Sequence, residues 1–192
     1  MNGLESIVLR NRLAQAGFEP SVFRYPSTRG DISEAGAALA AHLRSFDDVH
    51  LVGHSLGGLV ILAATESGRA LPAGRVVLLG SPVQGSRVAR TVAGWSTGAL
   101  LMGRLAAVEL TRHDTRIWRS PRELGIIAGS RSFGMGRLFA ELPAPNDGTV
   151  CVDETNVAGA KERIVLDVSH TGMLISSAVA QATSRFLAQG RF

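Results

Sequence analysis

The chain of 192 residues contains one cysteine, one lysine and few aromatic residues. Cys151 stands alone, so no intramolecular disulfide framework can form. Because Lys161 is the only lysine, the net charge of +4 is carried almost entirely by arginines, which are scattered without a basic block. Aromatic residues make up only 5% and form no base-stacking cluster. A dedicated nucleic-acid site is therefore not expected.

Long apolar runs are also absent. No segment reaches the roughly 18 apolar residues that a membrane span requires. The N-terminal stretch MNGLESIVLRNRLAQAGF is interrupted by charges at Glu5, Arg10 and Arg12, which is not typical of a signal peptide. As written, the sequence predicts a cytoplasmic protein without a transmembrane segment.

What the chain has in quantity is apolar side chains and glycine. Hydrophobic residues make up 45% and charged residues 19%, a composition typical of a globular core with little disorder. The length fits one domain, residues 1–192. The 22 glycines suit many tight connections between strands and helices.

Apolar periodicity predicts alternating strands and helices. We expect helices over 4–16, from Asp31 or Ser33 to about 46, and over 56–66, and a terminal helix that ends at about 187. We expect strands over 20–27, 49–52, 75–79, 123–130 and 163–168. This alternation predicts an α/β fold with a mostly parallel sheet. Residues 83–120 interrupt it, and we interpret them as a small inserted cap rather than a second domain.

The stretch Gly53-His54-Ser55-Leu56-Gly57-Gly58 lies between a predicted strand and a predicted helix. A serine in such a Gly-x-Ser-x-Gly turn projects its Oγ above the sheet edge, and we expect Gly53 and Gly57 to leave room for the neighbouring strand and helix. The backbone N–H of Leu56 would face a developing oxyanion. The alternative is a glycine-rich packing turn without chemistry.

A nucleophilic serine needs a base, and the chain offers five histidines. His42 and His113 are interpreted as solvated, and His50 as a packed core residue. His54 lies within the turn itself and cannot easily swing back onto the serine. His170 follows the last predicted strand, at the edge where parallel strands end, and is the best candidate for the base.

The base needs an orienting carboxylate. Asp147, in PAPNDGTV, follows the preceding strand and fits this place; Asp153 and Glu154 are runners-up, and Asp167 points from within the last strand. The alternative for Asp147 is a simple Asp-Gly turn residue.

The motifs GHSLGG, LGSPVQGS, PNDGTV and SHTGM resemble the bacterial lipase and esterase branch of the α/β-hydrolase family. They span residues 51–174. The resemblance implies a three-layer sandwich and cleavage of a small-molecule carboxylic ester through an acyl-enzyme, without metal or organic cofactor. It also implies the roles of the catalytic residues: Ser55 nucleophile, His170 base and then acid, Asp147 orienter, and the Leu56 N–H one oxyanion donor.

One departure from the family concerns the N-terminal region. Members normally begin with a strand ending in His-Gly, whose loop donates the second oxyanion N–H, whereas MNGLES leads directly into the following helix. We therefore expect a sheet lacking the strand between those at 21–25 and 49–52. Either Met1 to Gly3 is the remainder of that loop, or the natural product starts further upstream, which we favour. The open edge would invite self-association.

The insertion at 83–120 occupies the place of family lids. Its apolar residues can line an acyl pocket or simply pack the insertion onto the domain: Leu100, Leu101, Met102, Leu105 and Val108, with Trp95 and Trp118 equally ambiguous. Thioesterase, amidase or acyltransferase chemistry uses the same three side chains. A non-catalytic hydrolase-fold protein that serves as a binding or interaction module remains the alternative from another class.

Overall fold

The computed structural model describes residues 6–25, 31–93, 116–133 and 142–192. Four strands form one parallel sheet in the order β1 (Leu51–His54), β2 (Val76–Leu79), β3 (Leu124–Gly129) and β4 (Glu162–Leu166). The helices are α1 (Ile7–Gln15), α2 (Ile32–Leu43), α3 (Leu56–Glu66), α4 (Arg87–Ala93) and α7 (Ser177–Gln189), with short 3₁₀ helices η2 (Asp153–Thr155) and η3 (Thr171–Leu174). The sheet strands lie close to four of the predicted positions.

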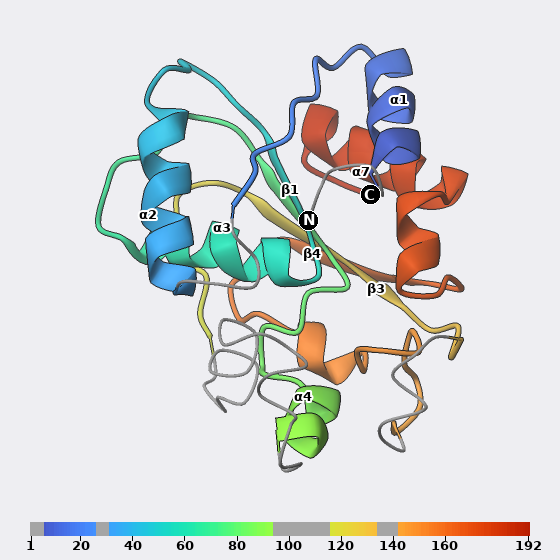
Figure 1. Ribbon diagram of the computed structural model, residues 1–192. Coiled ribbons are helices and arrows are strands. Elements are labelled where there is room, and N and C mark those ends of the chain that lie inside the picture. Colours follow the sequence, from blue (N-terminus) through green and yellow to red (C-terminus); the bar gives the residue numbers. More distant parts are fainter. Residues whose placement is uncertain (1–5, 26–30, 94–115, 134–141) are drawn as a thin grey trace.

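Helices cover both faces of the sheet, with α2 and α3 on one side and α1 and α7 on the other (Figure 1). Successive residues of a strand point to opposite faces. In β2, Val76 and Leu78 accordingly pack with α2 and α3, whereas Val77 and Leu79 pack with α1 and α7. This confirms the predicted three-layer α/β sandwich and explains why β2 and β3 are apolar throughout.

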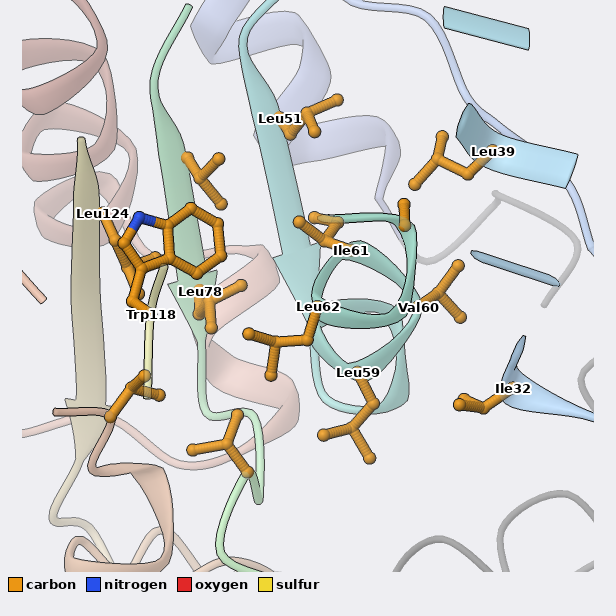
Figure 2. Packing of buried hydrophobic residues seen from close by; sticks show 14 of the residues in the cluster. Ile32, Leu39, Leu51, Leu59, Val60, Ile61, Leu62, Leu78, Trp118 and Leu124 are labelled. Atoms are coloured by element: carbon orange, nitrogen blue, oxygen red, sulfur yellow. The ribbon is translucent and has the colours of Figure 1, made fainter. Parts of the chain in front are cut away.

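Helix α3 is the centre of the larger core. In Figure 2, Leu62 points towards Leu78 of β2, while Val60 points towards Leu39 of α2. Complete burial of such an aliphatic side chain stabilises the fold by roughly 1.5–3 kcal/mol. Because α3 begins directly after Ser55, this packing holds that residue against the sheet.

Trp118, predicted either to line an acyl pocket or to pack onto the domain, packs in the same core. Its indole is 8% exposed, and Nε1 donates to the carbonyl of Arg122 at 2.6 Å. Trp95 and the five apolar residues proposed to line an acyl pocket fall within 94–115, outside the described residues. The cap interpretation is therefore untested over most of its length.

The N-terminus of α2 is capped by Asp31. Its carboxylate accepts from the Ser33 N–H at 3.1 Å, and Glu34 accepts in return from the Asp31 N–H at 3.4 Å. Of the two predicted caps, Asp31 is therefore correct. The two reciprocal bonds satisfy amide groups that a helix start leaves without intrahelical partners.

The strand predicted around residues 20–27 is wrong over the described part of that range. Residues 20–25 have no regular secondary structure, and among the described strands β1 pairs only with β2. Phe23 stacks on Tyr25 and lies 5.5 Å from the His42 ring, so these rings pack against the α2 side of the core. Their apolar character serves packing rather than strand pairing. The N-terminal residues 1–5 lie outside the described residues.

Within the described part of the chain, no helix is long and apolar enough to cross a membrane.

Candidate functional site

Ser55 lies in a sharp turn between β1 and α3. Its backbone has φ 53° and ψ −124°, and it is the one non-glycine residue with positive φ among those the structure describes. Its N–H donates to the Leu79 carbonyl at 2.9 Å, which ties the turn to the end of β2. Such a conformation costs about 1–3 kcal/mol and persists only where the surrounding structure enforces it.

Of the two glycines predicted to make room around Ser55, Gly53 does so and Gly57 does not. A Cβ on Gly53 would lie 2.7 Å from the Cα of Gly58, as expected for close strand-to-helix packing. Gly57 is predicted to be crowded as well, but among the described residues no atom outside its own stretch of helix backbone lies within 4 Å of such a Cβ, so that prediction is wrong. The second crowded position is Gly58, where a Cβ would lie 2.1 Å from Oγ of Ser81. The helix therefore approaches β2 through Gly58, and none of the described residues fills the space beside Gly57.

Asp147 is buried in a tight turn that follows the cis peptide between Ala144 and Pro145. Its Oδ1 accepts from the N–H groups of Thr149, at 2.9 Å, and Val150, at 2.7 Å. These two bonds fix the carboxylate and leave Oδ2 directed at the next element. The predicted alternative is that Asp147 serves only as an Asp-Gly turn residue. Oδ1 has this role within the turn, whereas Oδ2 is directed away from it.

The other oxygen of Asp147 contacts His170. Nδ1 of His170 lies 2.8 Å from Oδ2, and the two side chains are 10% and 1% exposed. The backbones are also joined, because the His170 N–H donates to the Asp147 carbonyl at 2.9 Å. The structure thus brings together two of the three side chains selected from the sequence, at positions that follow β3 and β4.

Two glycines that the sequence analysis did not select make room for Asp147. A Cβ on Gly129, at the end of β3, would lie 2.8 Å from the Asp147 Cβ and 2.5 Å from the Val168 carbonyl oxygen. A Cβ on Gly80, just after β2, would lie 3.0 Å from Oδ2 of Asp147. Each glycine stands at the end of a parallel strand, a position that could have indicated close approach to a site residue.

The alternative carboxylates have other partners. Asp153 pairs with Arg87 at 2.8 Å, which lowers the pKa of its carboxyl through the hydrogen bond. Asp167 is exposed and pairs with Arg131 at 2.7 Å.

Glu154 is buried and accepts from the backbone N–H groups of Arg87, at 2.6 Å, and Cys151, at 2.8 Å, while burial raises the pKa of its carboxyl. Glu154 therefore fastens the start of α4 to the loop after Asp147. None of these three carboxylates is hydrogen-bonded to His170.

The other histidines are placed largely as predicted. His42 is exposed on α2. His50 lies just before β1 and is partly buried, and its Nδ1 accepts from the Arg75 N–H at 2.9 Å. His113 lies outside the described residues.

His54 has a contact that sequence reasoning missed. Its Nε2 lies 3.0 Å from the His170 carbonyl oxygen, and the two imidazole centroids are 4.7 Å apart. Burial, followed by the proximity of His170, lowers the pKa of His54 to about 4. The residue before Ser55 therefore touches His170, which brings the turn that carries Ser55 next to the Asp147–His170 pair.

Among the described residues, no three His, Cys, Asp or Glu side chains gather as a metal site. The arrangement at the sheet edge instead offers a hydroxyl, an imidazole and a carboxylate. Such a set can perform nucleophilic and acid–base chemistry.

The sequence matches the model of the alpha/beta hydrolase family over residues 8–159. No curated protein matches the chain. Solved structures give a consistent picture of the fold, and they include bacterial lipases.

The mature form of the lipase BlEst2 from Bacillus licheniformis superposes with a TM-score of 0.71 at 19% identity, covering 96% of this chain and 84% of that one. Phospholipase PlaB from Legionella pneumophila superposes with a TM-score of 0.65 at 16% identity, covering 97% of this chain and 53% of that one. At these identities the likeness concerns the fold. Because the family model matches residues 8–159, which is most of this chain, the chain belongs to the α/β-hydrolase family.

Proposed function

We propose that the chain is a serine hydrolase that cleaves carboxylic esters of small molecules through an acyl-enzyme. The observation that carries this proposal is the 2.8 Å contact between His170 Nδ1 and Asp147 Oδ2. It occurs at the sheet edge where Ser55 occupies its strained turn. An imidazole held by a buried carboxylate beside such a serine is the arrangement that activates a hydroxyl.

The roles follow from which atoms are already engaged. Asp147 holds Nδ1 of His170, so Nε2 is the nitrogen that takes the proton from Ser55 Oγ as this oxygen attacks the ester carbonyl. Asp147 stays ionised and stabilises the imidazolium that forms. His170 then returns the proton to the leaving alcohol, which leaves Ser55 acylated.

Deacylation repeats these steps with water. His170 removes a proton from water, hydroxide attacks the acyl carbonyl, and Ser55 leaves with the proton that His170 returns. In both half-reactions negative charge develops on the carbonyl oxygen. The N–H of Leu56, the first residue of α3, is the proposed donor, because the first amides of a helix lack intrahelical partners and carry its positive dipole end.

The open space beside Gly57 supports this proposal. A reacting ester needs room next to the amide of Leu56, and a Cβ at Gly57 would meet no neighbouring side chain of the described part of the chain within 4 Å. The similarity to lipases supports an acyl ester as the class of substrate, without naming its acyl or alcohol group. Thioesters, and transfer of the acyl group to an acceptor other than water, use the same steps.

Labelling with a fluorophosphonate tests the proposal, with Ser55→Ala as the control. We expect stoichiometric labelling of wild type and none of the variant, together with hydrolysis of p-nitrophenyl acetate and butyrate by wild type only. An unlabelled wild type whose ester hydrolysis does not exceed that of Ser55→Ala would overturn it. The chain would then fit the alternative of a hydrolase-fold binding protein.

A further inference from the structure

His54 is the polar residue of the site whose purpose the proposed mechanism leaves unexplained. It lies at the end of β1, directly before Ser55. Its Nε2 lies 3.0 Å from the His170 carbonyl oxygen, and a carbonyl oxygen can only accept, so Nε2 carries the proton. Its Nδ1 is buried and has no hydrogen-bond partner among the described residues, which fits an unprotonated nitrogen.

We propose that His54 is a positioning residue, whose Nε2–H holds the carbonyl of His170 and thereby fixes the backbone that carries the proposed base. This inference rests on the proposed function, because positioning matters for catalysis only if His170 is the base.

The backbone of His170 is held from both of its ends. Its N–H donates to the Asp147 carbonyl at 2.9 Å, and its carbonyl accepts from His54. The side chain adds the contact to Oδ2 of Asp147. Asp147 thus fixes one peptide group and the ring, while His54 fixes the other peptide group. Removal of the His54 donor would leave a largely enclosed carbonyl without this partner, and the loop would relax.

The contact also sets the distance between the nucleophile turn and the base. His54 and Ser55 are adjacent, so a bond from His54 to His170 couples the two loops directly. This coupling is stiff because the Ser55 N–H also donates to the Leu79 carbonyl of the neighbouring strand β2. Displacements of about 1 Å between reacting groups can cost roughly 100-fold in rate.

A neutral His54 suits this role. The groups facing it are His170 and Asp147, and burial of the His54 ring disfavours its cation, which lowers its pKa. A neutral donor binds the carbonyl without repelling the imidazolium that His170 becomes during the reaction. His54 therefore supplies a hydrogen bond and no charge.

Two variants separate the hydrogen bond from packing. His54→Gln keeps a donor near the position of Nε2, whereas His54→Phe keeps the ring volume and removes the donor. We expect His54→Phe to lower kcat for p-nitrophenyl butyrate roughly 10- to 100-fold, with KM nearly unchanged, and His54→Gln to recover most of that loss. Equal activity of the two variants, or wild-type activity of His54→Phe, would overturn the proposal.

A second measurement needs neither turnover nor a variant. Nitrogen-15 NMR of the wild-type imidazoles reports which ring nitrogen carries the proton. We expect His54 to be protonated at Nε2 near neutral pH, and protonation at Nδ1 would overturn the proposal. If wild type fails to label with fluorophosphonate but shows this tautomer, the proposed function fails while the contact stands. If wild type hydrolyses esters but the tautomer is wrong, only the positioning role fails.

Discussion

Asp147 and His170 are joined twice, once between backbones and once between side chains. The backbone bond measures 2.9 Å and the side-chain contact 2.8 Å. The second Asp147 oxygen is meanwhile engaged by the N–H groups of Thr149 and Val150. The carboxylate is therefore oriented before any substrate arrives, and a substitution can change its charge without releasing the turn.

Asp147→Asn makes use of this separation. The amide oxygen can still accept from Thr149 and Val150, but the amide nitrogen would face Nδ1 of His170 as a donor and favour the wrong tautomer. If His170 is the base, we expect kcat to fall on the order of 10⁴-fold, as for such a carboxylate in a serine protease. Urea unfolding serves as the control and should show little change. An active Asp147→Asn would contradict the assigned role.

Alanine at Gly57 and at Gly58 should have opposite consequences for the fold. Gly58→Ala would place a Cβ 2.1 Å from Oγ of buried Ser81, and such overpacking costs about 1–3 kcal/mol in the free energy of unfolding. The methyl group of Gly57→Ala would meet no neighbouring side chain among the residues that the structure describes, so stability should hold or rise slightly.

The same pair reports on the substrate. Because we place the reacting ester beside Leu56, the methyl group of Gly57→Ala should raise KM for bulky esters more than for acetate. Urea titrations and a panel of p-nitrophenyl esters measure both effects. Equal stability of the two variants would show that the helix can move away from β2.

Gly129→Ala should disturb the site through Asp147. The added Cβ would lie 2.5 Å from the Val168 carbonyl oxygen and 2.8 Å from the Asp147 Cβ. We expect a loss of about 1–3 kcal/mol in stability and, in the folded fraction, lower kcat.

Gly125→Ala is the matched control within the same strand. Its Cβ would lie 2.9 Å from the Phe186 ring and 2.8 Å from the Phe192 ring, away from Asp147. It should destabilise the protein while leaving kcat per folded molecule unchanged. A comparable fall in kcat for both variants would mean that general destabilisation, and not displacement of Asp147, explains the effect.

The pKa of His54 makes stability depend on pH. A folded-state pKa of about 4 lies below the ordinary value of 6.5, so the unfolded chain binds the proton more readily. The contribution of neutral His54 is present above pH 6.5 and is lost as the pH falls towards 4. The full interval corresponds to up to about 3 kcal/mol.

Comparison with His54→Gln isolates this contribution, since the other groups titrate alike in both proteins. Urea unfolding at pH 7, 5.5 and 4.5 should show wild type losing more stability than the variant as the pH falls. Parallel losses in the two proteins would contradict a lowered pKa for His54.

Much of the architecture could be predicted because parallel strands buried on both faces are nearly continuous apolar runs. The runs at 75–79 and 123–130 therefore indicate β2 and β3. Ser55, Asp147 and His170 each follow a predicted strand, and the carboxyl ends of parallel strands meet at one edge of the sheet. The segment around Phe23 could not be predicted correctly, because apolar rings that pack on a helix resemble a short strand in sequence.

Contacts that depend on three dimensions could not be predicted. The pattern Gly-x-Ser-x-Gly drew attention to Gly57, yet the packing distance depends on Gly58 and Ser81, residues from different elements. The sequence shows only that His54 cannot easily swing back onto Ser55. Its actual partner is a backbone carbonyl more than a hundred residues away, and a carbonyl leaves no trace in sequence.

The packing of α1 against the same core as α7 has a consequence for synthesis on the ribosome. The face of the sheet formed by Val77, Leu79 and Ile127 is covered by elements from opposite regions of the chain. Until α7 has been synthesised, part of the apolar surface of this face remains exposed to water. His170 lies just before α7 and emerges equally late, so a partly made chain carries Ser55 and Asp147 without His170. The sheet edge would thus be completed only when α7 packs with α1 and closes this core.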